Sequence, residues 1–200
     1  MLSSRFGYGC FQRSLRPLLF ALICAPILIQ PAFHGRPSAA AFNTITVTSL
    51  TDATTNNGNC TLREAMQAAQ SNTAVDACTA GAPGLDVIEF NVGSGVPSIA
   101  LTSPLPVITS QMTINGNTGG ATRIELNGAG AGANTSGLTI VDTSGCIIQS
   151  LVINRFGLNG IVIETADNNT VKDCIIGLNP AADTDQGNGG HGITNNRSSN

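Results

Sequence analysis

A repeat in the second half of the chain decides the fold. Residues 138–176 read LTIVDTSGCIIQSLVINRFGLNGIVIETADNNTVKDCII. Five apolar residues of its first part recur 23 positions later: Leu138, Ile140, Ile148, Leu151 and Ile153 are followed by Ile161, Ile163, Val171, Cys174 and Ile176. A period in the low twenties is typical of a β-solenoid, in which each coil adds short strands to parallel sheets. We therefore expect an all-β fold, a parallel β-helix in which these ten residues form apolar ladders inside.

The same pattern continues downstream of this stretch. Residues 192–194 repeat the strand at 160–163, delayed by an insertion over residues 178–190 that should loop out from a corner. The chain then stops just after a coil has begun, with no polar cap to close the last coil. The sequence therefore predicts coils over residues 96–200 that continue in a longer protein.

Upstream the coils are less regular. Ile99 and Leu101 match Ile124 and Leu126 at an offset of 25, and residues 112–114 form a further strand candidate between them. Irregular first coils are expected where a solenoid is being capped.

The first 41 residues have the order of a secretory signal peptide. Arg13 and Arg16 precede an apolar run over residues 18–29, and small residues follow up to Ala41. The run is too short for a bilayer span of roughly 20 residues. We predict cleavage after Ala41, or one residue earlier, and no membrane span in the mature chain. The alternative is an uncleaved membrane anchor.

A short helix is expected at residues 62–70, in an N-terminal cap over residues 42–95. Thr61 and Glu64 have the spacing of a capping box, in which each satisfies the backbone N–H of the other. One helical face collects Leu62, Ala65, Met66 and Ala69. This helix should plug the N-terminal end of the solenoid, and its capping role explains Glu64 better than catalysis does.

Cys60 and Cys78 bracket the predicted helix. An exported protein meets an oxidising compartment, which makes this pair a disulfide candidate. A zinc site is the alternative, but no His lies between the two cysteines. Cys146 and Cys174 fall in different columns of the repeat, and we expect two buried free thiols there.

The cap resembles a known family. Residues 60–65, Cys60-Thr61-Leu62-Arg63-Glu64-Ala65, together with residues 66–69 and 85–90, are similar to the CSLREA domain, with Thr61 where that signature has Ser. This domain lies at the N-terminus of bacterial secreted and surface proteins with right-handed parallel β-helix repeats of the pectin-lyase-like fold. The resemblance implies a right-handed parallel β-helix and export of the protein, and it implies no enzymatic activity.

Composition and charge exclude several classes of function. Only 10% of the residues are charged, against 42% hydrophobic residues and 23 glycines, which disfavours both an α-helical protein and a disordered chain. Residues 1–41 hold four arginines and no acid, whereas the remainder holds five basic residues and all twelve acids. The mature part is therefore acidic, and nucleic acid is a poor candidate partner.

No catalytic constellation is visible. Hydrolysis of a glycan would need paired carboxylates on adjacent coils, but no column of acids forms from Asp142, Glu164, Asp167 and Asp173. Asp183 and Asp185 form the best Ca²⁺ candidate, and a solvated loop explains them better. We therefore expect no cofactor and no metal.

The sequence predicts a non-catalytic surface or secreted protein whose lateral faces contact glycans or other cell-surface components. The alternative is a polysaccharide lyase or glycoside hydrolase with its site mainly beyond residue 200.

Overall fold

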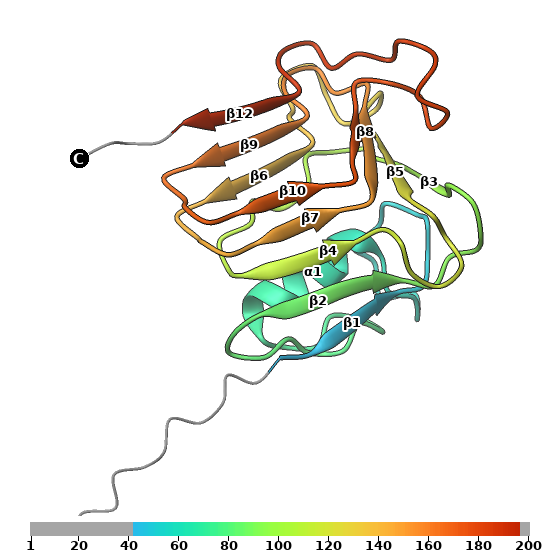
Figure 1. Cartoon of the computed structure of the whole chain (residues 1–200). Helices are drawn as coiled ribbons and strands as arrows, with labels where there is room; N and C mark the ends of the chain where they lie inside the picture. The colour runs from blue at the N-terminus through green and yellow to red at the C-terminus, as the bar shows by residue number, and fades with distance from the viewer. Residues whose placement is uncertain (1–41, 197–200) are drawn as a thin grey trace, which may run out of the picture. The chain divides into compact units, whose positions relative to one another are not determined.

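The protein is described by a computed structural model that covers residues 42–196. The predicted signal peptide, residues 1–41, lies outside the described residues. Most of the described elements are strands, and these form three parallel sheets beside one short helix (Figure 1). The first sheet contains β1 (Thr44–Val47), β2 (Asp86–Phe90), β4 (Met112–Asn115), β7 (Ile147–Gln149) and β10 (Thr170–Lys172). The second contains β3 (Ser98–Ala100), β5 (Ile124–Asn127), β8 (Leu151–Asn154) and β11 (Ile175–Ile176), and the third contains β6 (Leu138–Val141), β9 (Ile161–Glu164) and β12 (Ile193–Asn196).

From β4 onward the chain visits the first, second and third sheets in turn, and it does so three times. Each visit pairs a strand in parallel with the strand from the previous visit. The register follows the predicted offset of 23, because Leu138 pairs with Ile161, Ile148 with Val171, and Ile153 with Ile176. Residues that share a column of the repeat therefore stack on one another.

The predicted offset of the first coils was wrong. Ile99 pairs with Leu126, not with Ile124, so the offset between β3 and β5 is 27 and not 25. A two-residue slip keeps the same side chains on the inner face, because side chains alternate with a period of two. The hydrophobic pattern therefore could not distinguish the two registers.

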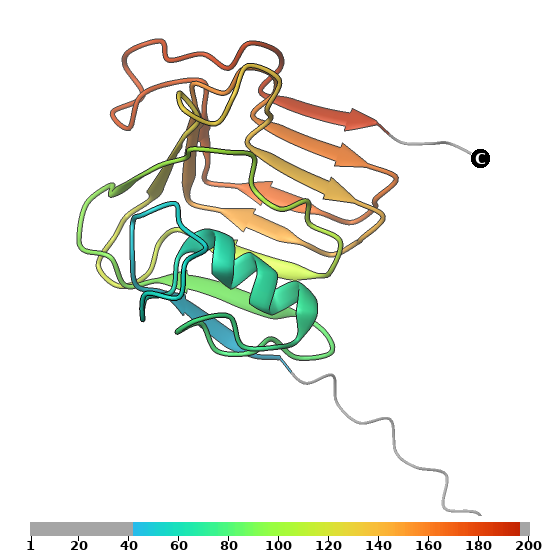
Figure 2. The same cartoon turned by 180° about the vertical axis from the view of Figure 1, so that it is seen from behind.

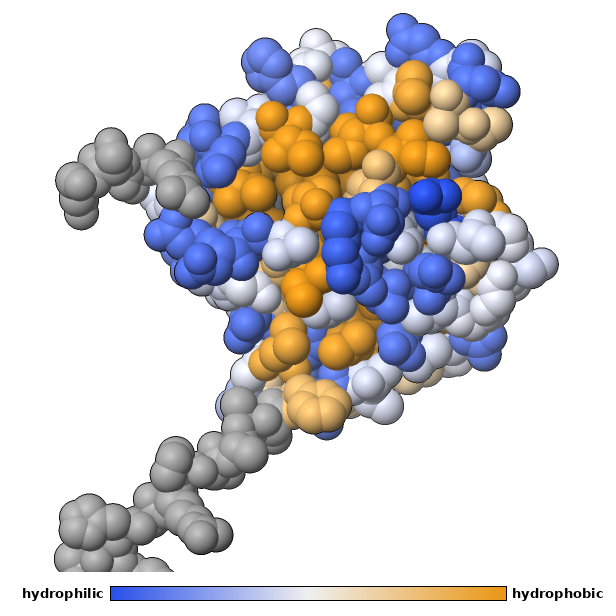
Figure 3. Space-filling model, in the orientation of Figure 1, coloured by the Kyte–Doolittle hydropathy of each residue, from blue (hydrophilic) through white to orange (hydrophobic). Residues whose placement is uncertain are grey.

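The inner positions of the strands form the apolar core. Ile148, Leu151 and Ile153 are fully buried, as are Ile114 and Ile124 in the coil below. In the last coil the matching residues Val171, Cys174 and Ile176 are only partly buried. Figure 3 shows apolar side chains gathered on the surface between β10 and β12.

The single helix among the described residues, α1 (Leu62–Ser71), ends one residue later than the sequence predicted. Thr61 is its N-cap, and Asn72 closes it in the left-handed conformation. The helix packs against the inner side of β1 and β2 (Figure 2), so that its predicted apolar face is buried: Leu62, Ala65, Met66 and Ala69. At the level of β1, the second and third sheets have no named strand, and α1 lies on the inner side of the first sheet there (Figure 2).

Within residues 42–196, no helix combines the length and the apolar character that crossing a membrane requires.

Candidate functional site

The cap contains a buried ion pair that fastens α1 to a distant loop. Nε of Arg63 donates to Asp52 Oδ1 at 2.8 Å, and Nη2 donates to Asp52 Oδ2 at 2.9 Å. The Asp52 carboxylate also accepts hydrogen bonds from the backbone N–H and the hydroxyl of Thr102. The guanidinium also donates to the carbonyls of Ser103 and Pro104. This network joins Asp52 and Arg63, which are 11 residues apart, to the loop at residues 102–104, which lies 40 to 50 residues further along the chain.

The environment of Asp52 favours its charged form. Burial of the carboxyl by itself raises its pKa, but the hydrogen bonds from Arg63 and Thr102 and the attraction of the guanidinium outweigh burial. The pKa of Asp52 therefore lies below its ordinary value. Only 2% of the Asp52 side chain and 10% of the Arg63 side chain are exposed. This ion pair therefore stabilises the fold and is hardly accessible to a ligand.

Glu64 acts as the sequence predicted, as a partner in the capping box. The backbone N–H of Thr61 donates to Glu64 Oε2 at 3.0 Å, and the N–H of Glu64 donates to the Thr61 hydroxyl at 3.3 Å. Glu64 is buried beneath the helix start, so its carboxylate does not face a surface where a substrate could bind.

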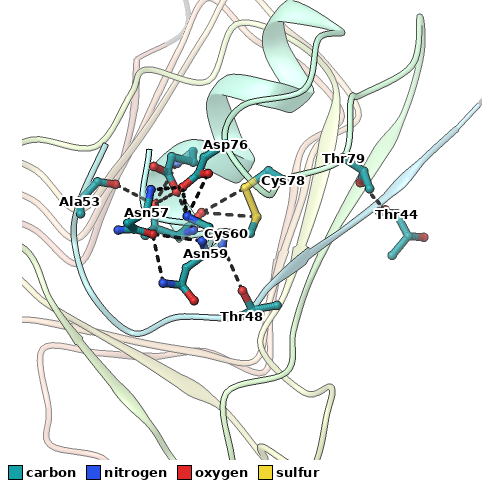
Figure 4. Close-up of a disulfide and its surroundings, with 12 residues drawn as sticks. Thr44, Thr48, Ala53, Asn57, Asn59, Cys60, Asp76, Cys78 and Thr79 are labelled. Atoms are coloured by element: carbon teal, nitrogen blue, oxygen red, sulfur yellow. Dashed lines mark hydrogen bonds between the residues drawn. A yellow bond between two sulfur atoms is a disulfide. The ribbon is translucent and has the colours of Figure 1, made fainter. Parts of the chain in front are cut away.

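A disulfide joins Cys60 and Cys78, the pair predicted from the sequence (Figure 4). Both residues are buried. The polar loop before Cys60 is held by Asp76, whose carboxylate accepts from the backbone N–H groups of Asn57 and Gly58. The disulfide and Asp76 together fix the loop against the segment that follows α1.

Cys146 and Cys174 are free thiols, as predicted. Cys146 is fully buried, and the side chain of Asn169 accepts from its backbone N–H at 2.8 Å. Cys174 is only partly buried, so the expectation of a second buried thiol was wrong. Burial raises the pKa of both thiols, which keeps them protonated and poorly nucleophilic.

A buried polar cluster on the outer face of the second sheet was not predicted. Asn154 is fully buried, and its Nδ2 lies 2.9 Å from Glu125 Oε1, 3.0 Å from the carbonyl of Leu178 and 3.1 Å from Gln186 Oε1. Leu178 and Gln186 belong to the 178–190 insertion. The insertion therefore leaves the corner, as predicted, and then folds back over this face of the sheet.

The acids of the coils do not converge. Glu164 pairs with Val141 in the register, and Asp142 accepts a hydrogen bond from the hydroxyl of Thr165 in the next coil. Asp183 lies in the exposed insertion, where hydrogen bonds from Asn179 and Thr184 lower its pKa. Across residues 42–196, no group of three or more His, Cys, Asp or Glu side chains is arranged to hold a metal ion.

The first sheet presents a polar column on its outer face. Asn115, Gln149 and Lys172 are consecutive partners in the register of β4, β7 and β10. Strands of a sheet lie about 4.8 Å apart, so the three side chains follow one another at that interval. We call these three residues the polar column. Lys172 is exposed, and the other two are partly exposed.

Comparison with models of protein families, with curated proteins and with solved structures gave no match for this chain.

Proposed function

We propose that this chain is an exported, right-handed parallel β-helix protein that binds a glycan or another cell-surface component through a lateral face and catalyses no reaction. The order in which the chain visits its three sheets, and the 23-residue register between visits, support the β-helix. Right-handed crossovers are the rule for parallel strands of one sheet. The leader sequence, the disulfide and the similarity of residues 60–65 to the CSLREA domain support export.

The polar column is the observation that carries the proposed binding role. An amide and an ammonium group offer several N–H donors, and an amide oxygen accepts, so the column can bond with hydroxyl-rich ligands. Within the described residues, the side chains of Gln149 and Lys172 have no hydrogen-bond partner that would compete with a ligand. The column lies on the outer face of the longest sheet, where a polymer can lie along successive strands.

Binding to immobilised polysaccharides of different composition tests this role. We expect at least one neutral or acidic glycan to retain the protein, and the double variant Gln149→Ala with Lys172→Ala to lose most of that retention. The matched control is Thr139→Ala with Glu164→Ala, which removes two side chains from the outer face of the third sheet. Equal loss in both variants, or no retention on any glycan, would refute binding through the polar column.

The same polysaccharides test the absence of catalysis. We expect their chain lengths to remain unchanged after incubation with the protein. Shortening of pectin or of any other glycan would refute the non-catalytic part of the proposal.

Export has its own test. The N-terminal sequence of the protein recovered from the medium or from the cell surface should begin at Phe42, or one residue earlier. Recovery with the leader intact would refute a cleaved signal peptide.

A further inference from the structure

A group of four oxygen atoms beneath the 178–190 insertion has too few hydrogen-bond donors. Three of them surround Asn154 Nδ2: Glu125 Oε1 at 2.9 Å, the carbonyl of Leu178 at 3.0 Å and Gln186 Oε1 at 3.1 Å. An amide nitrogen carries only two hydrogens, so it cannot donate a full hydrogen bond to all three oxygens. The fourth oxygen, Asn154 Oδ1, is buried and has no hydrogen-bond partner. We call these four atoms the oxygen cluster.

The oxygen cluster also contains a carboxylate without a counter-ion. Glu125 is only 8% exposed, and across residues 42–196 no basic side chain forms an ion pair with it. A buried charge is costly unless it is paired or coordinates a metal ion. Asn154 donates to this carboxylate, but a neutral amide leaves the negative charge in place. The cluster therefore lacks a positive charge as well as hydrogen-bond donors.

The spacing of the four oxygens suits a hard cation. A half-turn of the Asn154 amide exchanges Nδ2 for Oδ1, and it places Oδ1 about 3 Å from each of the other three oxygens. Two oxygens that lie about 3 Å apart, each about 2.4 Å from a Ca²⁺ ion, subtend an angle of about 77° at the ion. This angle is close to the spacing of equatorial ligands in the pentagonal bipyramid that Ca²⁺ often adopts.

We propose that the oxygen cluster binds one Ca²⁺ ion and that water completes its coordination. The ion supplies the positive charge that Glu125 lacks, and it gives Asn154 Oδ1 and Gln186 Oε1 a bonding partner. Mg²⁺ demands octahedral geometry and keeps its own waters, and Zn²⁺ prefers nitrogen and sulfur ligands. A single carboxylate predicts a weak site, with a dissociation constant of about 0.1 to 1 mM, as in extracellular Ca²⁺-binding modules.

The ion would fasten the insertion to the second sheet. Glu125 and Asn154 belong to β5 and β8, whereas Leu178 and Gln186 belong to the insertion. Bound Ca²⁺ therefore links two segments that otherwise meet through hydrogen bonds of the same Asn154 amide. We expect Ca²⁺ to slow the cleavage of the insertion by a protease of broad specificity.

Calorimetric titration of the chelator-treated full chain with CaCl₂ tests this proposal. We expect one Ca²⁺ ion per chain, and Mg²⁺ binding at least about tenfold weaker. Glu125→Gln keeps the size of the side chain but removes its charge, and it should weaken Ca²⁺ binding at least about tenfold. The control is Asp183→Asn, which removes a charge from the exposed part of the same insertion, where the sequence placed its best Ca²⁺ candidate. This variant should bind Ca²⁺ as the wild type does.

Proteolysis of the insertion gives a second readout. Ca²⁺ should slow its cleavage in the wild type and in Asp183→Asn, but not in Glu125→Gln. If circular dichroism shows that Glu125→Gln does not fold, Gln186→Leu removes a different ligand from the insertion and takes its place. Absence of binding at Ca²⁺ concentrations well above the expected range, unchanged affinity in the folded cluster variant, or loss of binding in Asp183→Asn would each overturn the proposal.

Discussion

We expect Asp52→Ala to destabilise the protein far more than the loss of an ordinary surface ion pair. The substitution leaves the Arg63 guanidinium buried without its carboxylate, and it removes the acceptor of the Thr102 N–H. Removal of one partner of a buried ion pair costs about 3 to 5 kcal/mol. Because Arg63 keeps the carbonyls of Ser103 and Pro104 as acceptors, we expect a value near the lower limit, about 3 kcal/mol.

Urea unfolding with the disulfide intact measures this cost. A protein of this size has an m-value of about 2 kcal/mol per molar urea, so the midpoint should fall by about 1.5 M. Arg63→Met should cost a similar amount, since it leaves the Asp52 carboxylate buried without its cation. The double variant should cost clearly less than the two single variants added together, because residues of one network are coupled by about 0.5 to 3 kcal/mol.

The control for this experiment is Asp183→Ala, which removes an exposed acid of the insertion and should leave the midpoint unchanged. A loss of less than about 1 kcal/mol for Asp52→Ala, the usual range of a surface pair, would refute the structural role of this network. Strict additivity of the two single variants would refute the coupling between them.

The remaining predictions concern pH, the disulfide, the core and one glycine. The pKa of Asp52 is lower in the folded than in the unfolded protein, so its contribution to stability is present above the unfolded pKa of about 3.9 and is lost as the pH falls through the folded value. The stability of Asp52→Asn should therefore approach that of the wild type below about pH 4. A difference in stability that does not shrink in acid would contradict this. Cys60→Ser with Cys78→Ser should lower the free energy of unfolding by about 3 kcal/mol, from the 18-residue separation of the two cysteines, and an unchanged urea midpoint would contradict it. Ile153→Ala should lower the free energy of unfolding by about 3 kcal/mol. Ile176→Ala should lower it by less than half of that, because Ile176 pairs with Ile153 in the same ladder but is only partly buried. Equal thermal melting temperatures of the two variants would count against the ladder. Gly128→Ala should destabilise the second sheet because the added methyl group would overlap the ring of Phe156, and a stability equal to the wild type would show that the ring can move aside.

The sequence predicted the features that depend on local or periodic patterns. The apolar ladder was visible because inner positions recur with each coil, and the register repeats that spacing from Leu138 to Ile176. The helix was visible because a capping box and one apolar face lie within ten residues. The disulfide was visible because Cys60 and Cys78 bracket that helix in a chain whose leader predicts export. In each case the signal is a local motif or a regular spacing that the sequence displays directly.

The features that were missed depend on contacts between distant segments. No pattern around Asp52 indicates that its carboxylate meets Arg63 and Thr102, because the loop between β3 and β4 brings Thr102 to the cap. Asn154 and Glu125 stand at outward positions of their strands, where alternation predicts exposure. They are buried because the 178–190 insertion folds back over them, and an insertion has no place in a periodic pattern.

The distribution of charge favours the first sheet over the cap as the place of the proposed binding role. Asp52, Arg63 and Glu64 are all committed to hydrogen bonds that hold α1 in place, and Asp86 accepts from the backbone N–H groups of Asn43 and Ala82. Groups that are buried and paired in this way stabilise the fold and are not accessible to a ligand. The side chains of Gln149 and Lys172 point outward from successive strands and have no partner within the described residues. A ligand would therefore gain most of its polar contacts along the first sheet, at positions where substitution leaves the core intact.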